Sequence, residues 1–394
     1  MGTKILWYLK HIDGRYPWSA AGRYEFDPAR IVRTAQALDR AGFHGALHGT
    51  SSSDPLVTVS ALIAATDRLR FLVPIYPGLT TPRLLAKQAL TFDQLSGGRL
   101  LVNIVNGQDP QLRAYGQFVP HEKRYEQSAD YWRLFTDFYE GRSGTYDDTY
   151  LDNRARSGEA TEVGAPIFTD SLQGAPFGPF QQPHPPLWGA GASDAGQEHA
   201  GQVVEVYLAF LREQASVAAQ VEAAHAAAAR HGRAFEAVGI HGSLIVRRTR
   251  QQALDAFYEG FIAVGAEQFA ADTNDRIAKL TGGAHDLTTF TAPDARRQGW
   301  VDSLRAGRLP ALDDLELEPG VYAGLTEFIP VLDVFGRGSS TYLVGGGEEI
   351  AGRLRRYREE IRGVDRFIFS GWPLESEALE AADHLFPYID DLEQ

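Results

Sequence analysis

The stretch TPRLLAKQALTFDQLSGGRLLVNIVNG, residues 81–107, decides the fold that this sequence predicts. Thr81 and Pro82 are an N-cap and a first-turn proline, which together indicate the start of a helix, and Gly97 indicates its end. The apolar run at 99–105 then predicts a buried strand. A capped helix that leads through a short glycine turn into a buried strand is typical of a β/α protein.

The same pattern recurs along the chain. Asp27 with Pro28, and Asp54 with Pro55, indicate two earlier helices, and a strand precedes each of them. The sequence predicts eight strands, at residues 3–9, 45–49, 69–76, 99–105, 185–190, 203–210, 238–247 and 364–371. Strands that alternate with helices pair in parallel. A doubly wound sheet and a barrel both satisfy this pattern, and the count of eight favours an α/β protein with a (β/α)8 TIM barrel.

Two long segments interrupt this alternation. Residues 142–184 are rich in Gly, Pro and Asp, and residues 265–340 show little periodicity. Long connections of this kind are usually functional loops within a compact domain. We therefore expect a single barrel domain over residues 1–394 with two insertions, and we interpret the second insertion as a lid or a protein interface.

Composition limits the classes of function. The formal charge of −13 argues against a nucleic-acid binder or a partner of anionic membranes, which both need a basic surface. The absence of cysteine excludes disulfides, thiolate metal sites and thiol nucleophiles. The N-terminus does not resemble a signal peptide, and no window has the length of a membrane span. We expect a cytoplasmic enzyme.

Polar or aromatic side chains follow several of the predicted strands, at the end of a barrel where ligands bind. His11 follows the first strand, Ser52 the second, and Trp372 the eighth. His241 and Ser243 occupy alternate positions of the seventh strand, so their side chains point the same way. Each also has a structural interpretation, as a packed or hydrogen-bonded residue. Their gathering at one predicted end favours a site.

Asn103 lies in the middle of the fourth predicted strand, and Asn106 and Gly107 follow it. A buried strand amide must be hydrogen-bonded, and a bound heterocycle would supply the partners. An asparagine satisfied by the protein itself is the alternative.

A glycine-rich turn at 187–197 joins a strand to a helix, and its backbone N–H groups, helped by Ser193, suit a phosphate. Gly189 and Gly191 fit a dinucleotide fingerprint, but its third glycine would fall on Asp194. The sequence contains no zinc-protease, P-loop or nucleophile-elbow motif and no metal-spaced cluster. The chemistry is therefore expected to come from a cofactor, with no metal.

Taken together, these stretches resemble the bacterial luciferase-like flavin-dependent monooxygenases, and the alkanesulfonate monooxygenase branch is the most similar. The resemblance runs from about residue 4 to about residue 390 and is weak between roughly 250 and 335. The stretches that carry it are FLVPIYPGLTTPRLLAKQALTFDQLSGGRLLVNIVNGQDP, HEKRYEQSADYWRLF, QQPHPPLWGAGASDAGQ and YLVGGGEEIAGRLRRY with FIFSGWPLESEALEAADHLFPYI.

The resemblance implies a luciferase-like barrel that takes FMNH2 from a separate NAD(P)H-dependent flavin reductase. The reduced FMN reacts with O2 to a peroxyflavin that oxygenates a small organic substrate, and in the sulfonate branch the product loses sulfite. A homodimer or homotetramer is expected. Asn103 and Asn106 would line the isoalloxazine, with Gly107 giving close backbone approach. The family's phosphate-binding positions match Tyr125, Ala192 and Ser193, beside Gly191 in the same turn.

The departures from the sulfonate branch concern the substrate. His11 lies near the active-site position of the first strand. The other substitutions are Ser52 for a cysteine, His241 and Ser243 for an arginine and a histidine, Trp372 for a tyrosine, and Arg337 as the approximate counterpart of a loop arginine. A lost strand arginine removes a bidentate anion clamp. We expect an altered substrate, such as a more apolar organosulfur compound or a natural-product intermediate, with His241 exchanging a proton near neutral pH.

Three other functions are compatible with parts of this pattern. A relative that transfers hydride with the deazaflavin F420 would have the same barrel, although the sequences of the fourth strand and of the segment HEKRYE favour FMN. A non-catalytic flavin-binding protein would fit the loss of the expected cysteine, arginine and tyrosine. An NAD(P)-linked barrel oxidoreductase lacks a recognisable dinucleotide site.

Overall fold

The computed structural model describes residues 2–50, 53–107, 109–142, 144–146, 161–163, 178–325, 330–336 and 340–394. The chain divides into two compact units. Unit 1 contains Met1–His44, Phe210–Ala219 and Ile240–Gln394, and unit 2 contains Gly45–Ala209 and Gln220–Gly239. This division does not test the prediction of a single domain, which stays a prediction.

All eight strands expected from the sequence are formed. They are β1 (Thr3–Leu9), β2 (Gly45–His48), β3 (Arg70–Ile75), β4 (Leu100–Ile104), β7 (Leu187–Ala190), β8 (Val206–Phe210), β9 (Ala237–Arg247) and β13 (Val364–Ser370). The pairings of β1 with β13 and along β2, β3, β4, β7 and β8 are parallel, and helices alternate with these strands along the chain. The predicted (β/α)8 barrel is confirmed.

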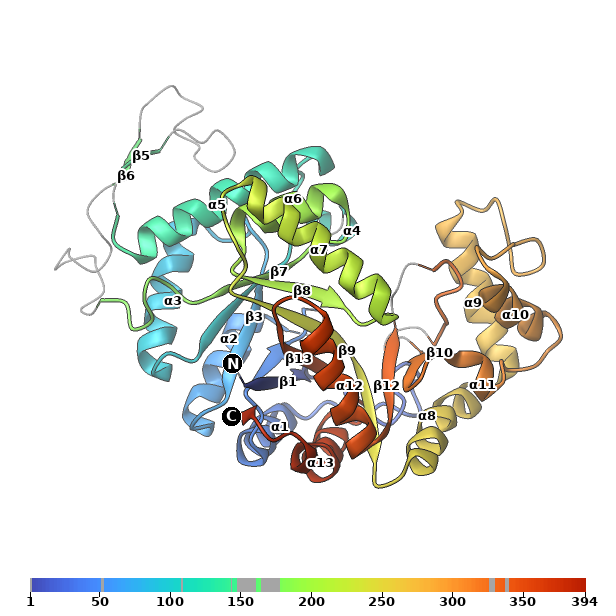
Figure 1. Cartoon of the computed structure of the whole chain (residues 1–394). Helices are drawn as coiled ribbons and strands as arrows, with labels where there is room; N and C mark the ends of the chain where they lie inside the picture. The colour runs from blue at the N-terminus through green and yellow to red at the C-terminus, as the bar shows by residue number, and fades with distance from the viewer. Residues whose placement is uncertain are drawn as a thin grey trace. The chain divides into compact units, whose positions relative to one another are not determined.

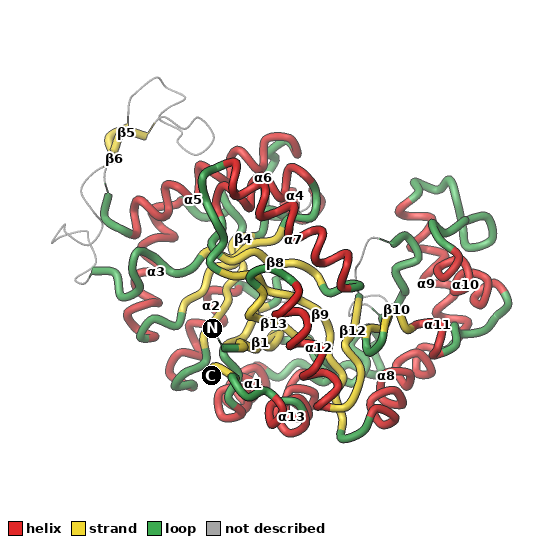
Figure 2. Tube along the Cα trace, viewed as in Figure 1, coloured by secondary structure: helices red, strands yellow, loops and turns green. Residues whose placement is uncertain are grey.

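In unit 2 the strand order is β2-β3-β4-β7-β8. The helices of this unit are α2 (Pro55–Leu62), α3 (Pro82–Ser96), α4 (Asp109–Ala114), α5 (Arg124–Tyr139), α6 (Asp194–Val203) and most of α7 (Gln214–Arg230). Helix α3 packs against α5, and α5 against α6, on the outside of the strands (Figure 2). The hydroxyl of Thr81 accepts the backbone N–H of Leu84, and Gly97 ends α3 at φ 68°, so both predicted ends of this helix are confirmed.

Arg99 ties the beginning of β4 to the segment before β3. Its guanidinium donates to the carbonyl oxygen of Ser96 at 2.8 Å, to Thr66 Oγ1 at 2.8 Å, and to the carbonyl oxygens of Ile63 and Leu69 at 2.8 and 3.2 Å. The side chain is buried, at 8% exposure. It therefore satisfies carbonyl groups at two helix ends, where a positive charge is favourable.

In unit 1 the strand order is β10 (Glu316–Glu318), β11 (Val321–Ala323), β12 (Thr341–Gly346), β9, β13 and β1, with β14 (Leu392–Glu393) beside β1. The sequence did not predict β10 and β11, which form an antiparallel pair that continues to β12. The second half of β9 pairs in parallel with β12, with Ser243 opposite Tyr342. Helices α1 (Pro28–Ala41), α8 (Arg250–Val264), α12 (Gly347–Glu360) and α13 (Leu374–His384) belong to this unit.

The second insertion folds around apolar side chains of its own. Helices α9 (Ala266–Leu280), α10 (Ala295–Arg305) and α11 (Leu312–Leu315) lie together beside α8 in Figure 1. Phe269, Ile277 and Trp300 are buried in a cluster that includes Phe257 of α8 and Tyr342 of β12. Whether this segment is a lid or a protein interface is untested and stays a prediction.

The first insertion falls mostly outside the described residues. Within it, β5 (Gly144–Tyr146) and β6 (Thr161–Val163) form an antiparallel pair. The helices of the described residues include none that is long and apolar enough to cross a membrane. The described part of the chain also contains no group of three or more side chains that could hold a metal ion.

The role of Arg99 can be tested by replacement with alanine. Arg99→Ala leaves several buried carbonyl groups without a donor, so we expect the free energy of unfolding to fall by about 2–3 kcal/mol. Urea denaturation measures this change. Arg40→Ala, at an exposed position near the end of α1, is the matched control and should change it by less than about 0.5 kcal/mol. Equal effects of the two substitutions would contradict the assignment.

Candidate active site

The turn between β7 and α6 in unit 2 brings together residues expected to hold a phosphate. Ser193 is the N-cap of α6, and its Oγ accepts the backbone N–H of Gly196 at 3.2 Å. A Cβ built on Gly196 would lie 3.1 Å from the hydroxyl oxygen of Tyr125, which belongs to α5. The hydroxyls of Tyr125 and Ser193 therefore converge on the first turn of α6.

Gly191 allows this turn to close. A Cβ at Gly191 would lie 2.3 Å from the carbonyl oxygen of Gly196, so a side chain there would displace the helix. The carbonyl oxygen of Gly191 accepts the hydroxyl of Tyr207 at 2.5 Å, which holds the turn against β8. Ala192 is exposed, so a ligand can reach the N-terminal end of α6, where backbone N–H groups favour an anion. Asp194 is exposed as well, and solvent screens its charge.

The amides expected to contact a cofactor ring lie at the end of β4. Asn103 is half-buried. Ile104 pairs with Gly189 of β7. Asn106 lies two residues after Ile104, and Gly191 two residues after Gly189, so both lie at the same edge of the sheet. The Oδ1 atom of Asn106 is buried and has no hydrogen-bond partner among the described residues. Because an unpaired buried acceptor costs about 1–3 kcal/mol, this oxygen is suited to an N–H donor from a ligand.

The backbone conformation and packing of Gly107 explain why this residue is glycine, without a bound ligand. Its φ is +70°, in the left-handed region, and a Cβ there would lie 2.8 Å from a methyl carbon of Leu112. The close approach of Gly107 to a flavin stays a prediction.

A buried histidine lies beside the Tyr125 ring. The Nε2 atom of His199 is 2.9 Å from the hydroxyl oxygen of Ser128, and the His199 and Tyr125 ring centroids are 5.3 Å apart. Burial lowers the pKa of His199 to about 4. The imidazole is therefore neutral at pH 7, and protonating it would work against folding.

In unit 1, His241 lies between two aromatic rings. Its ring centroid is 6.1 Å from that of Tyr8 on β1 and 5.6 Å from that of Phe210. Burial lowers the pKa of His241 to about 4. The neutral form therefore prevails at pH 7, and the proton exchange that the sequence placed near neutral pH shifts to about pH 4.

Ser243 and His11 are placed without a defined chemical role. The hydroxyl oxygen of Ser243 is 3.1 Å from that of Ser370, at the end of β13. His11 is half-buried, with its ring centroid 5.6 Å from that of Phe26, and burial lowers its pKa. Roles for Ser243 and His11 in the reaction stay predictions.

Asp13 joins the segments that follow β1 and β13. Its Oδ1 accepts the backbone N–H of Gly14 at 2.8 Å and that of Leu374, the first residue of α13, at 3.0 Å. The buried carboxylate thus caps α13 from the loop after β1. On the same loops, the ammonium nitrogen of Lys10 lies 4.8 Å from the centre of the Trp372 ring. The loop after β1 therefore contacts the Trp372 ring and caps the helix that follows it.

A cavity of about 340 Å³ in unit 1 is formed by these loops, by the second half of β9 and by α8. Trp372 lines it, together with Tyr16, Trp18 and Tyr24 from the loop after β1. Seven of its 17 lining residues carry aromatic rings. The cavity therefore lies beyond the carboxyl ends of β1 and β13, where barrel enzymes bind their substrates.

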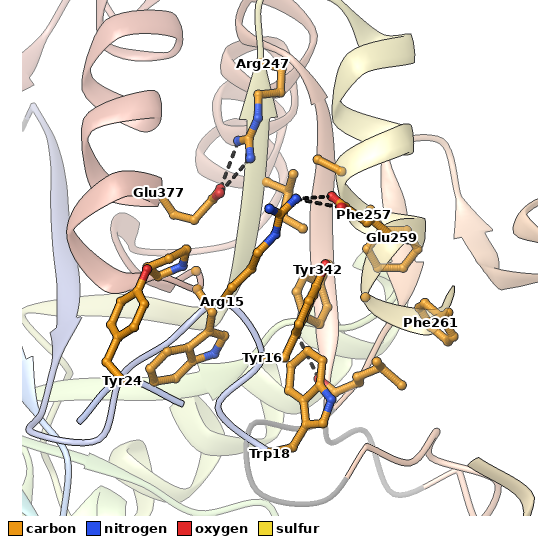
Figure 3. A pocket seen from close by; sticks show the side chains of 17 residues that line it. Arg15, Tyr16, Trp18, Tyr24, Arg247, Phe257, Glu259, Phe261, Tyr342 and Glu377 are labelled. Atoms are coloured by element: carbon orange, nitrogen blue, oxygen red, sulfur yellow. Dashed lines mark hydrogen bonds and ion pairs between the residues drawn. The ribbon is translucent and has the colours of Figure 1, made fainter. Parts of the chain in front are cut away.

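Two arginine–glutamate pairs also line this cavity, and dashed lines mark them in Figure 3. Arg247 makes a bidentate contact with Glu377 at 2.6 and 2.8 Å, and Glu377 is buried at 8% exposure. Arg15 contacts both carboxylate oxygens of Glu259 at 2.6 Å, in an exposed position. Removing one partner of a buried ion pair costs about 3–5 kcal/mol of folding stability, so Arg247 remains paired with Glu377.

Sequence analysis missed most of the residues that line the cavity, although two signals were present. The segment RYPW, residues 15–18, places three large side chains in the loop that follows the first strand. Arg247 follows Ser243 by four residues on β9 and so lies on the same face of the strand. Strand β9 thus carries an arginine, although not at the position expected from the resemblance.

Two proposed site residues, Ser52 and Arg337, lie outside the described residues. Of the others, the structure brings Tyr125, Gly191 and Ser193 together in unit 2. In unit 1 it places Trp372 in the cavity wall, and His241 and Ser243 on the face of β9 that also carries Arg247.

Comparison with known proteins identifies relatives of this fold. A family model described as luciferase-like monooxygenase matches residues 13–364. Riboflavin lyase (RcaE), solved with modified FMN and riboflavin, is similar at 18% identity and a TM-score of 0.69, covering 100% of this chain and 94% of its own. EDTA monooxygenase (EmoA) from Chelativorans sp. BNC1 is similar at 20% identity and a TM-score of 0.66, covering 99% and 94%.

A relative with another cofactor shares the fold. The coenzyme F420-dependent tetrahydromethanopterin reductase from Methanopyrus kandleri is 12% identical, with a TM-score of 0.61, and covers 99% of this chain and 100% of its own. The architecture alone therefore does not choose between FMN and F420.

The lowered pKa of His199 predicts an acid sensitivity. A group whose pKa is about 4 in the folded chain and 6.5 when unfolded contributes stability above pH 6.5, and this is lost as the pH falls toward 4. Between pH 7.5 and pH 5 the loss from His199 should be about 2 kcal/mol. Urea denaturation of wild type and His199→Gln at both pH values measures it, because the variant should lose about 2 kcal/mol less.

The control is His285→Gln, at an exposed position, which should keep the wild-type dependence on pH. A His199→Gln variant whose stability falls as steeply as that of the wild type would show that His199 is already charged, or exposed, in the folded chain.

Proposed function

Since the chain belongs to the luciferase-like monooxygenase family, we propose that it is a two-component flavin-dependent monooxygenase that uses FMNH2 and O2 to oxygenate a small organic substrate. The family confirms the expected enzyme class, an oxidoreductase of the monooxygenase type. The FMNH2 would come from a separate NAD(P)H-dependent flavin reductase, and the enzyme would act as a homodimer or homotetramer. The identity of the cofactor and of these partners belongs to the proposal.

The single observation that carries the choice of a flavin is the buried Oδ1 of Asn106, which has no donor among the described residues. The isoalloxazine of a flavin presents ring N–H groups, and a reduced flavin presents more of them than an oxidised one. Asn106 would accept one of these groups. The same edge of the sheet carries Gly191, so a ring near Asn106 and a phosphate near the β7–α6 turn are compatible with the parallel pairing of β4 and β7.

The phosphate end of FMN fits the first turn of α6. The hydroxyls of Tyr125 and Ser193 would donate to phosphate oxygens, and the backbone N–H groups of the turn would add to them. When bound, FMNH2 would supply the two electrons with which O2 gives one oxygen atom to the substrate and the other to water. The protein would hold the cofactor and orient it.

The altered substrate is also part of the proposal. We retain ancestry in the alkanesulfonate branch as an inference from the sequence motifs, with a substrate that is not a simple sulfonate. The ion pair between Arg247 and Glu377 supports this, because the arginine of β9 is already neutralised. His241 is neutral at pH 7 and so offers no charge to a sulfonate group.

An anaerobic titration of the full chain with FMNH2, oxidised FMN, reduced F420 and NADPH tests the cofactor, with tryptophan fluorescence as the readout. We expect FMNH2 to bind at least tenfold more tightly than each of the other three. Preference for F420 would support hydride transfer instead. Equal affinity for both FMN redox states, without substrate-dependent oxygen consumption, would support a non-catalytic flavin-binding protein, and tighter binding of NADPH an NAD(P)-linked enzyme.

Two variants test separately the residues proposed to bind the phosphate and the ring of the cofactor. Tyr125→Phe removes a phosphate donor, so we expect FMNH2 to bind about tenfold more weakly and reduced riboflavin, which has no phosphate, to bind as before. Asn106→Ala should weaken both ligands. Gln268→Ala, exposed on α9, is the control that should change neither. Loss of riboflavin binding in Tyr125→Phe would contradict the assignment of Tyr125 to the phosphate.

A further inference from the structure

The cavity of unit 1 has a wall that is aromatic and, in sum, uncharged. The charged side chains among its described lining residues are two arginines and two glutamates, paired with each other. The remaining large groups are rings, including Trp18, Tyr24 and Trp372. In the view of Figure 3 the rings of Tyr16, Trp18 and Tyr342 lie on the side of the cavity away from the Arg247–Glu377 pair.

Among the described residues that line this cavity, both arginines are already paired with a glutamate when an anionic ligand arrives. Both terminal nitrogens of Arg247 donate to Glu377, at 2.6 and 2.8 Å. A ligand that bound this guanidinium would therefore leave the buried carboxylate of Glu377 without a partner. Arg15 is paired with Glu259 through one terminal nitrogen, which contacts both carboxylate oxygens at 2.6 Å, and its exposed position lets solvent screen any attraction to an anion.

A cationic ligand would meet rings whose faces already attract cations of the protein. The ammonium of Lys10 lies 4.8 Å from the centre of Trp372, and the guanidinium carbons of Arg30 and Arg15 lie 4.7 Å from Tyr24 and 5.7 Å from Tyr16. An aromatic cage for a cation needs the ring faces to be free of other positive charges. These three rings are therefore poor partners for a second cation.

We propose that this cavity binds the substrate of the enzyme, and that the substrate class is an uncharged, flat aromatic compound. The assignment as substrate rests on the proposed monooxygenase function, whereas the binding preference rests on the cavity alone. A volume of about 340 Å³ is within the range of small-molecule sites. The edges of the seven aromatic side chains, and those ring faces that carry no cation, favour edge-to-face and stacked contacts with a second aromatic system.

Three ligands that share one ring system and carry a neutral, an anionic or a cationic substituent at the same position test the preference. They are 2-naphthol, naphthalene-2-sulfonate and 2-naphthylmethylammonium, titrated by calorimetry into the full chain without flavin at pH 7. We expect 2-naphthol to bind at least tenfold more tightly than either ion. Tighter binding of the sulfonate or of the ammonium, or the absence of 2-naphthol binding, would overturn the proposal.

Substitutions test whether these naphthyl ligands bind in this cavity. Glu377→Gln releases Arg247, so naphthalene-2-sulfonate should gain at least tenfold in affinity relative to 2-naphthol. The matched control is Glu198→Gln, which releases Arg230 from an exposed pair in unit 2 and should leave the preference unchanged. A merely structural role of Glu377 would weaken all three ligands alike, and that outcome would overturn the role assigned to the ion pair.

A second variant keeps the test valid if Glu377→Gln does not fold. Ala256 lines the cavity from α8 and is half-buried, so Ala256→Phe should fill part of it and weaken 2-naphthol at least tenfold. Unchanged binding in a folded Ala256→Phe would place the ligand elsewhere and overturn the proposal.

The binding and the function can fail separately. Binding of 2-naphthol without flavin-dependent oxygen consumption would contradict the monooxygenase function, or the assignment of this class as substrate, and leave the cavity preference in place. Oxygen consumption with an anionic substrate, together with failure of 2-naphthol to bind, would support the function and overturn the substrate class.

Discussion

Parallel pairing of strands is the constraint on which the candidate sites depend. Parallel strands all end at the same edge of their sheet, so segments far apart in the sequence must emerge beside one another. In unit 1 this brings the loop after β1, with Trp18, to the loop after β13, with Trp372, and both line one cavity. In unit 2 the register of Ile104 with Gly189 brings the β4 amides to the same edge as the β7–α6 turn.

Charge compensation then decides what these edges can bind. Arg247 lies on the face of β9 that carries His241 and Ser243, where an arginine would ordinarily serve as an anion clamp. Its bidentate contact with Glu377 of α13 removes that capacity and leaves an aromatic wall as the main feature of the cavity. The opposite holds in unit 2, where the first turn of α6 keeps its N-terminal backbone groups accessible beside two hydroxyls.

The helices and strands of the second insertion could not be predicted from the pattern of apolar residues along the chain. Its helices α9 and α10 were not predicted, because their buried residues pack against partners from several elements and so do not follow one regular apolar stripe. Trp300 and Phe269 belong to a cluster with Phe257 of α8 and Tyr342 of β12. Strands β10 and β11 are three residues each, too short for alternation to stand out.

By itself the sequence determined the eight barrel strands, the capped helices between them and the family, because caps, glycine stops and apolar runs act over a few neighbouring residues. It also indicated Asn106, Ser193 and Trp372 as residues at strand or helix ends, and the family resemblance implied Tyr125. Only the tertiary structure decided that the Asn106 oxygen is buried without a donor among the described residues, that burial lowers the pKa of His241, and that Glu377 pairs with Arg247. These properties depend on which groups exclude water from one another, and those groups lie far apart in the chain; Arg247 and Glu377 are 130 residues apart.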